Sequence, residues 1–389
     1  MDVTVASGFL RYFLDLPDPR GVNRIHKLHD LIVIAVMAVI CGADGWAQVA
    51  LFGRCKQKWF STFLELPGGI PSHDTFGRVF SRLNPDAFDR CFLAWMSALV
   101  ELSGGRLVAI DGKSIRRSFE HAWDKSGMTH LVSALVSQGG NRVVFGQVAV
   151  EDKSNEITAI PKLLEMMDLR GAVVTIDAIG TQREIAGKII EGKGDYVLVV
   201  KDNQPALHEK VTALMDEAAI GPVGGLNVGF FEEHDENHGR IETRKTWVVN
   251  DTSSLGKPLL DLWPGLATGS LTMVERLRQN LGDPTGKTTV ERHYCISSLK
   301  GSDDEAARTL AAYVRGHWAV ENNLHWQLDM SFNEDDRRIR KGHGAENFSR
   351  LSRIALNLLK RNHTIKAGIK GKRLYAGWDH DYLLKLISA

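Results

Sequence analysis

The chain has 389 residues, of which 43% are hydrophobic and 24% are charged. These values are typical of soluble globular proteins, so they exclude a disordered, collagen-like or low-complexity chain and predict two or three structural units. The formal net charge of +1 gives by itself no indication of a polyanionic partner, and four cysteines without a CxxC pair argue against a disulfide framework or a cysteine zinc site.

The N-terminal part of the chain, residues 1–104, is predicted to be helical and to contain a DNA-binding region. Its longest apolar run, LIVIAVMAVIC, has eleven residues where a membrane span needs about 20, so we expect a buried helix in a cytoplasmic protein without a membrane partner. Ser72 and Asp74 can cap a helix over 75–83 that ends before Pro85. The glycine-containing turn before this helix is typical of a helix-turn-helix, and an ordinary helical hairpin explains the pattern equally well.

A change of periodicity after residue 104 predicts an α/β region. Three strands come first, and Gly139-Gly140-Asn141 is a hairpin signal between the second and the third. Helices and strands then alternate, so the order β-β-β-α-β-α-β predicts a mixed sheet with helices on its faces. The expected strands cover 106–111, 129–137, 142–150, 172–177 and 195–200, and the expected helices cover 156–168 and 181–192.

The remainder of the chain returns to a β pattern and then to helices. The expected elements are a helix over 204–219, strands between 222 and 299, a helix over 304–330 and a basic helical region from 345 onward. The resulting division comprises a catalytic core formed by 105–205 and 300–360, a β-rich insertion over 206–299 and a basic C-terminal tail over 361–389.

The charges of the chain are distributed unevenly. Between Arg337 and Arg373 there are twelve Lys and Arg residues and one acid, Glu346, so this segment carries +11 and the rest of the chain −10. Such a cationic block is a candidate phosphate-binding surface. The alternative is a solvated helix face, although such a face usually includes acids as well.

Two apolar strands are followed directly by an aspartate, Asp111 in VAIDG and Asp177 in VTIDA. Mixed α/β sheets present side chains to a crevice at this end of their strands, and the predicted order could make the two ends neighbours. Adjacent carboxylates repel unless a cation lies between them, and oxygen ligands favour Mg²⁺ or Mn²⁺. Each aspartate alone could also be a turn or cap residue.

A two-metal site for phosphoryl transfer requires a third carboxylate, and Glu321 in the predicted helix over 304–330 is the best donor. His317, Glu321 and His325 share one face of this helix, and that spacing could hold zinc instead. The pattern differs from the HExxH of metalloproteases, and zinc would leave both aspartates without a role. We therefore favour three carboxylates that hold two magnesium or manganese ions.

A set of longer motifs extends over nearly the whole chain. They are PSHDTFGRVF (71–80), IDGKSIRRSF (110–119), KSNEITAIPKLLE (153–165), VTIDAIGTQREIA (174–186), GDYVLVVKDNQP (194–205), HGRIETR (238–244), YVRGHWAVENNLHWQLDMSFNEDD (313–336), RIRKGHGAENFSRLSRIALNLLK (338–360) and KGKRLYAGWDHDYLLK (370–385). This set resembles the H-repeat-associated branch of bacterial insertion-sequence DDE transposases. The resemblance implies a ribonuclease H-like mixed-sheet catalytic core with a β-rich insertion, an N-terminal DNA-binding region and divalent-metal dependence.

The resemblance makes Asp111 the first D, Asp177 the second D and Glu321 the E of the catalytic set. Related transposases carry an Arg four residues before this Glu and a Lys seven residues after it, whereas His317 and Leu328 occupy these positions here. Nearby acids are therefore alternative donors of the third carboxylate. These acids are Asp329, Glu334 and Asp335.

Basic and polar residues near the carboxylates are candidates for binding DNA phosphates, and such contacts should weaken at high salt. The expected partners are double-stranded DNA at the element ends and target DNA, bound by a homodimer in the bacterial cytoplasm, in association with the nucleoid. The candidate DNA-binding residues are Lys113, Arg116, Arg117, Lys201, Asn203, Arg315, His317, Arg337, Arg338, Arg340 and Lys341.

The expected activity is metal-dependent cleavage at an insertion-sequence end, followed by attack of the freed 3′-hydroxyl on target DNA. A structure-specific endonuclease of the same fold would use the same carboxylates without joining strands. A catalytically decayed relic would only bind DNA. A glycosidase would also use paired carboxylates, but it would leave the basic block unexplained.

Overall fold

A computed structural model describes residues 8–99, 106–118, 128–138, 141–150, 156–221, 226–237, 239–281 and 288–388 of the chain. The chain divides into two compact units, each assembled from separate stretches of sequence. Unit 1 contains the residues up to 101, 112–155 and 321–389, and unit 2 contains 102–111 and 156–320. The four-part division expected from the sequence follows the chain instead of these contacts, and it stays a prediction.

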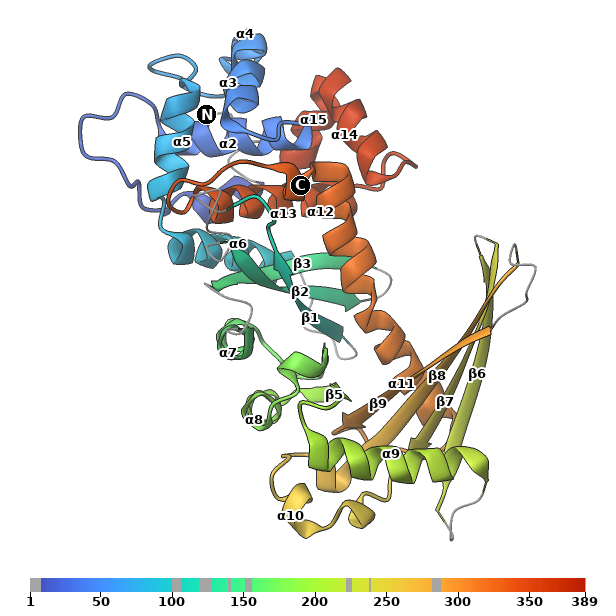
Figure 1. Cartoon of the computed structure of the whole chain (residues 1–389). Coiled ribbons are helices and arrows are strands. Elements are labelled where there is room, and N and C mark those ends of the chain that lie inside the picture. Colours follow the sequence, from blue (N-terminus) through green and yellow to red (C-terminus); the bar gives the residue numbers. More distant parts are fainter. Residues whose placement is uncertain are drawn as a thin grey trace. The chain divides into compact units, whose positions relative to one another are not determined.

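The sheet of unit 2 combines parallel and antiparallel strands in the order β1-β4-β5-β9-β8-β7-β6. Strands β1, β4 and β5 run parallel, and all five residues of β4 are buried, as expected for apolar runs covered on both faces. The long strands β6 to β9 are antiparallel and lie side by side (Figure 1). The strands are β1 (Arg106–Ser114), β4 (Ala172–Ile176), β5 (Asp195–Val200), β6 (Val228–Asn237), β7 (Arg240–Val249), β8 (Ser270–Asn280) and β9 (Thr288–Ser297).

Two helices cover opposite faces of the antiparallel part of this sheet. Cys295 packs into an apolar cluster with Leu310 and Val314 of α11, whereas the neighbouring Tyr294 donates from its hydroxyl to Asp216 of α9 at 2.7 Å. Because successive side chains of a strand point to opposite faces, α11 and α9 lie on different sides of β9. The helices of unit 2 are α7 (Glu156–Glu165), α8 (Arg183–Glu191), α9 (Pro205–Ile220), α10 (Lys257–Leu260) and α11 (Asp304–His317).

Strand β1 continues from unit 2 into unit 1 and adjoins the hairpin of β2 (His130–Gln138) and β3 (Asn141–Val150). The predicted order β-β-β-α-β-α-β is confirmed by β1, β2, β3, α7, β4, α8 and β5. The expected hairpin turn at Gly139 and Gly140 lies outside the described residues. The four strands between 222 and 299 and the helices after 345 are also as expected.

Unit 1 is built around α13 (Gly344–Arg361), of which only Glu346, Lys360 and Arg361 are not buried. Helices α2, α5, α6, α14 and α15 and strand β3 all pack against it. The apolar run of α2 is buried, as predicted, and no helix in the described part of the chain is long and apolar enough to span a membrane. The other helices are α2 (Leu28–Ile40), α3 (Trp46–Cys55), α4 (Gln57–Phe60), α5 (His73–Arg82), α6 (Pro85–Leu99), α12 (Trp326–Phe332), α14 (Ile369–Trp378) and α15 (His380–Ile387).

Helix α5 begins as the sequence suggests. The Ser72 hydroxyl accepts a hydrogen bond from the Thr75 backbone N–H at 3.2 Å, which satisfies one of the free donors of the first turn. Helix α5 ends at Arg82, and Pro85 opens α6. Helix α3 packs against α5. A role of these helices in reading DNA stays a prediction.

Candidate active site

Asp111 lies within β1 and Asp177 directly follows β4, the neighbouring parallel strand of unit 2. Strands β1 and β4 pair in a register that places Ile110 opposite Ile176, so both aspartates come next at the same edge of the sheet. The two aspartates are neighbours along the paired strands, as expected, but β1 continues to Ser114 instead of ending at Asp111. Asp177 precedes a short 3₁₀ turn, but its side chain makes no capping hydrogen bond to that turn, which argues against the cap interpretation.

Lys201 places a positive charge beside Asp177. The residue follows β5, and its ammonium Nζ lies 3.3 Å from Asp177 Oδ1. About half of each side chain is exposed, so the pair is hydrated and contributes little to stability. Asn203 donates from Nδ2 to the Ala178 carbonyl at 2.6 Å, which fixes the loop after β5 against the turn after β4. The ion pair at Asp177 is therefore a half-exposed contact that solvent can reach.

His317, at the C-terminal end of α11, lies close to both aspartates. Its Nδ1 is 3.2 Å from Thr175 Oγ1, in the strand that leads to Asp177. Burial lowers the pKa of His317, while the negative charges of Asp111 and Asp177 act in the opposite direction. Because burial dominates, the imidazole is neutral at pH 7 and adds no positive charge to the acidic edge.

Glu321 belongs to unit 1, where it is exposed and opens a π-helical segment, Glu321–His325. The expectation of one uninterrupted helix over 304–330 is therefore wrong, because α11 ends at His317 and α12 begins only at Trp326. A π-helical turn alters the regular backbone hydrogen bonds, and such turns are frequent at functional sites. Lys360 donates from Nζ to the Asn323 carbonyl at 2.7 Å and so provides this turn with a side-chain donor.

No three His, Cys, Asp or Glu side chains gather into a metal-binding group in the residues that the structure describes. All residues of the expected three-carboxylate set are described, and they do not form such a group. The same is true of the alternative zinc set of His317, Glu321 and His325. Asp111 and Asp177 nevertheless have the donor chemistry that a hard cation prefers, since both present carboxylate oxygens at one sheet edge. In the structure, the Lys201 ammonium is the positive charge that lies next to the Asp177 carboxylate.

Comparison with known proteins identifies the family. The family described as Transposase DDE domain matches residues 102–358, and a DDE_Tnp_1-associated region matches residues 10–96. The chain belongs to the DDE transposase family. The match to the domain includes Asp111, Asp177 and Glu321.

Curated relatives of this DDE transposase family cover about three quarters of the chain or more. Putative transposase YncI of Escherichia coli O157:H7 is 38% identical over 98% of the chain and 94% of the relative. The H repeat-associated putative transposase YhhI of Escherichia coli (strain K12) is 35% identical over 96% of each. An uncharacterized protein in the dhlA 3′ region of Xanthobacter autotrophicus is 44% identical over 74% of the chain and 93% of the relative. The resemblance to H-repeat-associated transposases is thereby confirmed.

Acids of unit 1 hold several of the transposase's candidate DNA-binding cations. Lys113 pairs with Asp329 and, at 3.3 Å, with Glu334, while Arg116 lies 3.1 Å from Asp335. The three acids considered as alternative metal ligands thus already have cationic partners. Arg117 likewise lies 3.3 Å from Asp336, and its carbonyl accepts from Arg340 Nε at 3.3 Å.

The cationic block between residues 337 and 373 is not a continuous phosphate-binding surface. Five of its twelve cations are buried: Arg337, Arg350, Arg353, Lys372 and Arg373. Arg337 donates to the Phe332 carbonyl at 2.6 Å and lies over the Phe348 ring, so this candidate serves the interior of unit 1. Arg338 and Lys341 are exposed. The prediction of a phosphate-binding surface is based on the charge of +11, and a count of charges along the sequence does not show which of them are neutralised by buried acids.

Arg315, another candidate for DNA contact, forms ion pairs with Glu233 at 2.9 Å and Asp235 at 2.8 Å. Two polar residues at the acidic edge were not expected from the sequence, Thr175 and His293. Burial lowers the pKa of His293, and its ring lies 5.7 Å from that of Trp318. The polar Thr175 within the apolar run AVVTI is the signal that could have indicated a buried hydrogen-bond partner.

Proposed function

We propose that the protein cleaves DNA at the ends of an insertion sequence and joins the freed strand to target DNA. The observation that carries this proposal is the parallel register that brings Asp111 and Asp177 to one sheet edge, within a chain of the DDE transposase family. The strand order β1-β4-β5 and the helices α7 and α8 support a ribonuclease H-like core, with β6 to β9 as its insertion.

Asp111, Asp177 and Glu321 would hold one or two Mg²⁺ or Mn²⁺ ions. Such ions would supply the positive charge that lowers the barrier to in-line displacement at phosphorus. Lys201 partly neutralises Asp177 before DNA binds. The neutral His317 fixes the end of β4 through Thr175 and leaves the positive charge to the cation.

Exposed cations would hold the DNA backbone near this chemistry. Lys201, Arg116, Arg338 and Lys341 are exposed and can approach phosphates, whereas Arg337 is excluded by its burial. Phosphate contacts release condensed counterions, so binding should weaken steeply as salt rises. Two element ends must be brought together for joining, which favours a homodimer in the active complex.

The test uses a labelled duplex that ends in the inverted repeat flanking this reading frame, with Mg²⁺ and a supercoiled target. We expect cleavage and a joined product with the wild-type protein, and neither with Asp111→Asn, which keeps the size of the side chain. Binding of the duplex in Ca²⁺ should be the same for both proteins. Cleavage without joining would support the endonuclease instead, and full cleavage by Asp111→Asn would refute the metal site.

A further inference from the structure

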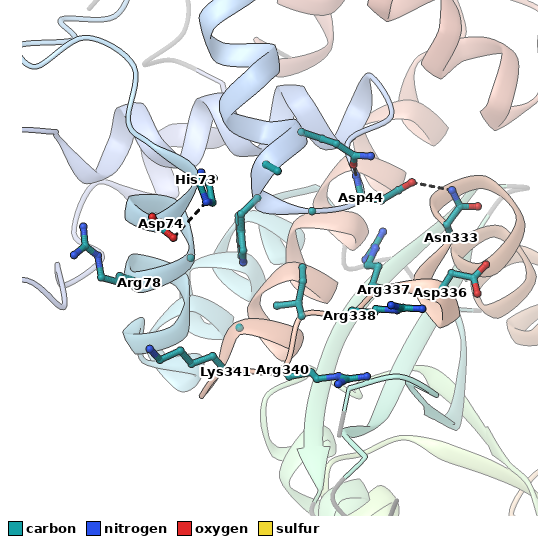
Figure 2. A pocket seen from close by; sticks show the side chains of 17 residues that line it. Asp44, His73, Asp74, Arg78, Asn333, Asp336, Arg337, Arg338, Arg340 and Lys341 are labelled. Atoms are coloured by element: carbon teal, nitrogen blue, oxygen red, sulfur yellow. Dashed lines mark hydrogen bonds and ion pairs between the residues drawn. The ribbon is translucent and has the colours of Figure 1, made fainter. Parts of the chain in front are cut away.

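A pocket of about 810 Å³ opens in unit 1 (Figure 2). Its walls come from the N-terminal turn of α3, from α5 and from the segment 333–344 that connects α12 to α13. These three stretches are far apart in the sequence but belong to one compact unit. The volume lies within the range of about 300–1,000 Å³ that is usual for ligand sites.

The pocket is lined by more cations than acids, and the acids already have partners. Five cations line it: Arg78, Arg337, Arg338, Arg340 and Lys341. The three acids are Asp44, which accepts from Asn333 Nδ2 at 2.8 Å, Asp74, which lies 3.4 Å from His73, and Asp336, which lies 3.3 Å from Arg117. Arg78, Arg338 and Lys341 are exposed, so they remain accessible to an anion.

An aromatic ring contributes to the same pocket. Trp46 stacks on Phe80 with ring centroids 4.8 Å apart and planes inclined by 18°, and it meets Phe348 edge to face at 4.8 Å. These contacts fix the orientation of the indole, which remains partly exposed at the pocket. A rigid, partly exposed indole beside arginines and a lysine combines the two elements that bind single-stranded nucleic acids, a stacking surface and a cationic track.

We propose that this pocket binds a short unpaired DNA segment, with phosphates on Arg78, Arg338 and Lys341 and a base against Trp46. The proposal rests on the proposed function only in taking DNA as the substrate. The bases of an intact duplex are already stacked on one another, so they offer no free face to the indole. An unpaired strand offers both a free base face and flexible phosphates. Such strands arise next to a cleavage or joining site, where one DNA strand is interrupted.

The test compares a blunt duplex with the same duplex carrying a four-nucleotide single-stranded overhang, by fluorescence anisotropy in Ca²⁺. The wild-type protein should bind the overhang DNA about tenfold more tightly, the gain that one stacked base provides. Arg78→Ser combined with Lys341→Ser should abolish this preference and reduce the salt slope for the overhang DNA by about 1.4, since each lost single-strand phosphate contact contributes about 0.7. Lys370→Ser, an exposed lysine of α14 outside the pocket, is the matched control and should keep both.

A second arm reports on the aromatic wall. An overhang carrying 2-aminopurine should lose fluorescence on binding to the wild-type protein, and Trp46→Leu should remove most of this quenching. Thermal melting of Trp46→Leu checks that unit 1 of this variant still folds. If the variant is unfolded, the serine double variant, which changes only exposed side chains, provides the test. An unchanged overhang preference in the serine double variant would overturn the proposal.

The two proposals fail in different ways. Loss of cleavage in Asp111→Asn with an intact overhang preference supports both of them. Cleavage that persists in Asp111→Asn would refute the metal site and leave the proposal for the pocket unaffected. Cleavage at element ends with no overhang preference in the wild-type protein would refute the pocket alone.

Discussion

The two units place their carboxylates in opposite electrostatic settings. In unit 2, Asp111 and Asp177 occupy neighbouring positions, in β1 and directly after the parallel strand β4, and Asp177 forms a half-exposed ion pair with Lys201. In unit 1, Glu334 is fully buried and accepts from Ser349 at 2.6 Å, from Arg353 at 3.2 Å and from Lys113 at 3.3 Å. The first arrangement leaves the carboxylate of Asp177 about half exposed, whereas the second buries Glu334 completely among its cations.

The pKa of Glu334 makes the same distinction. Burial by itself raises the pKa of this carboxyl, but the charges of Arg353 and Lys113 outweigh it and lower the pKa to about 2. Glu334 is therefore ionised as part of the fold and is not a convincing ligand for an exchangeable metal ion. The chemical role of a carboxylate in this protein therefore depends on how closely it is already paired with a cation.

The largest difference between the carboxylates of the two units is expected in the rate of DNA cleavage. We expect Asp177→Asn to lower the rate of Mg²⁺-dependent strand cleavage by at least about a thousandfold, because one oxygen ligand of the cation loses its charge. Asp329→Asn, in the acid that pairs with Lys113, should lower it by less than about tenfold. Single-turnover cleavage of a labelled duplex measures both. Equal losses in the two variants would mean that unit 1 acids act as metal ligands.

The next effect concerns stability. Glu334→Gln leaves Arg353 buried without its counter-charge, so the free energy of unfolding should fall by about 3–5 kcal/mol. Asp177→Asn should leave it unchanged or raise it slightly, because the substitution removes repulsion from Asp111. Urea denaturation followed by circular dichroism provides the measurement. A destabilisation by Asp177→Asn as large as that by Glu334→Gln would erase the distinction between the two sites.

A smaller effect depends on pH and on the Lys360 ammonium, which bonds to the π-helical turn. Burial lowers the pKa of Lys360 to about 7, whereas the unfolded chain has the ordinary value of about 10.5. The unfolded state therefore binds more protons between these values, and stability should rise with pH across this window by up to about 1.4 kcal/mol per unit. Lys360→Met should remove this rise, while Lys366→Met, in an exposed lysine, should keep it.

The smallest effect is expected at Arg315. Its ion pairs with Glu233 and Asp235 are about half exposed at the arginine, so Arg315→Ala should lower the free energy of unfolding by less than about 1 kcal/mol. If Arg315 also contacts DNA, the same variant should reduce the salt slope of duplex binding by about 0.9. A salt titration of binding separates the two roles, since only the second one changes that slope.

Much of the fold could be predicted because the local signals agree with the tertiary structure. The strand 195–200 and the cap at Ser72 follow directly from apolar runs and capping chemistry, and the pairing of β1 with β4 follows from the strand order. These features depend on residues close together in the chain or on a simple topology. The π-helical turn at 321–325 could not be read in this way, because its sequence is compatible with a regular helix.

The cationic segment failed as a predictor for a related reason. Arg350 is 1% exposed and pairs with Asp89 and Glu346, and Asp89 lies 261 residues earlier in the chain. A count of neighbouring charges cannot include such a distant partner. Only the tertiary structure distinguishes the buried cations of this block from the exposed ones. Of the cations in this block that line the pocket, Arg338 and Lys341 are exposed.

The order of the helices along the chain has a consequence for synthesis. Helices α2, α5 and α6 leave the ribosome long before residues 344–361, yet they cover their apolar faces with this later helix. Although N-terminal regions often fold while translation continues, these helices cannot complete their packing until residue 361 has been synthesised. A premature stop codon or a frameshift upstream of α13 would therefore yield a fragment with an exposed apolar surface that is prone to aggregation.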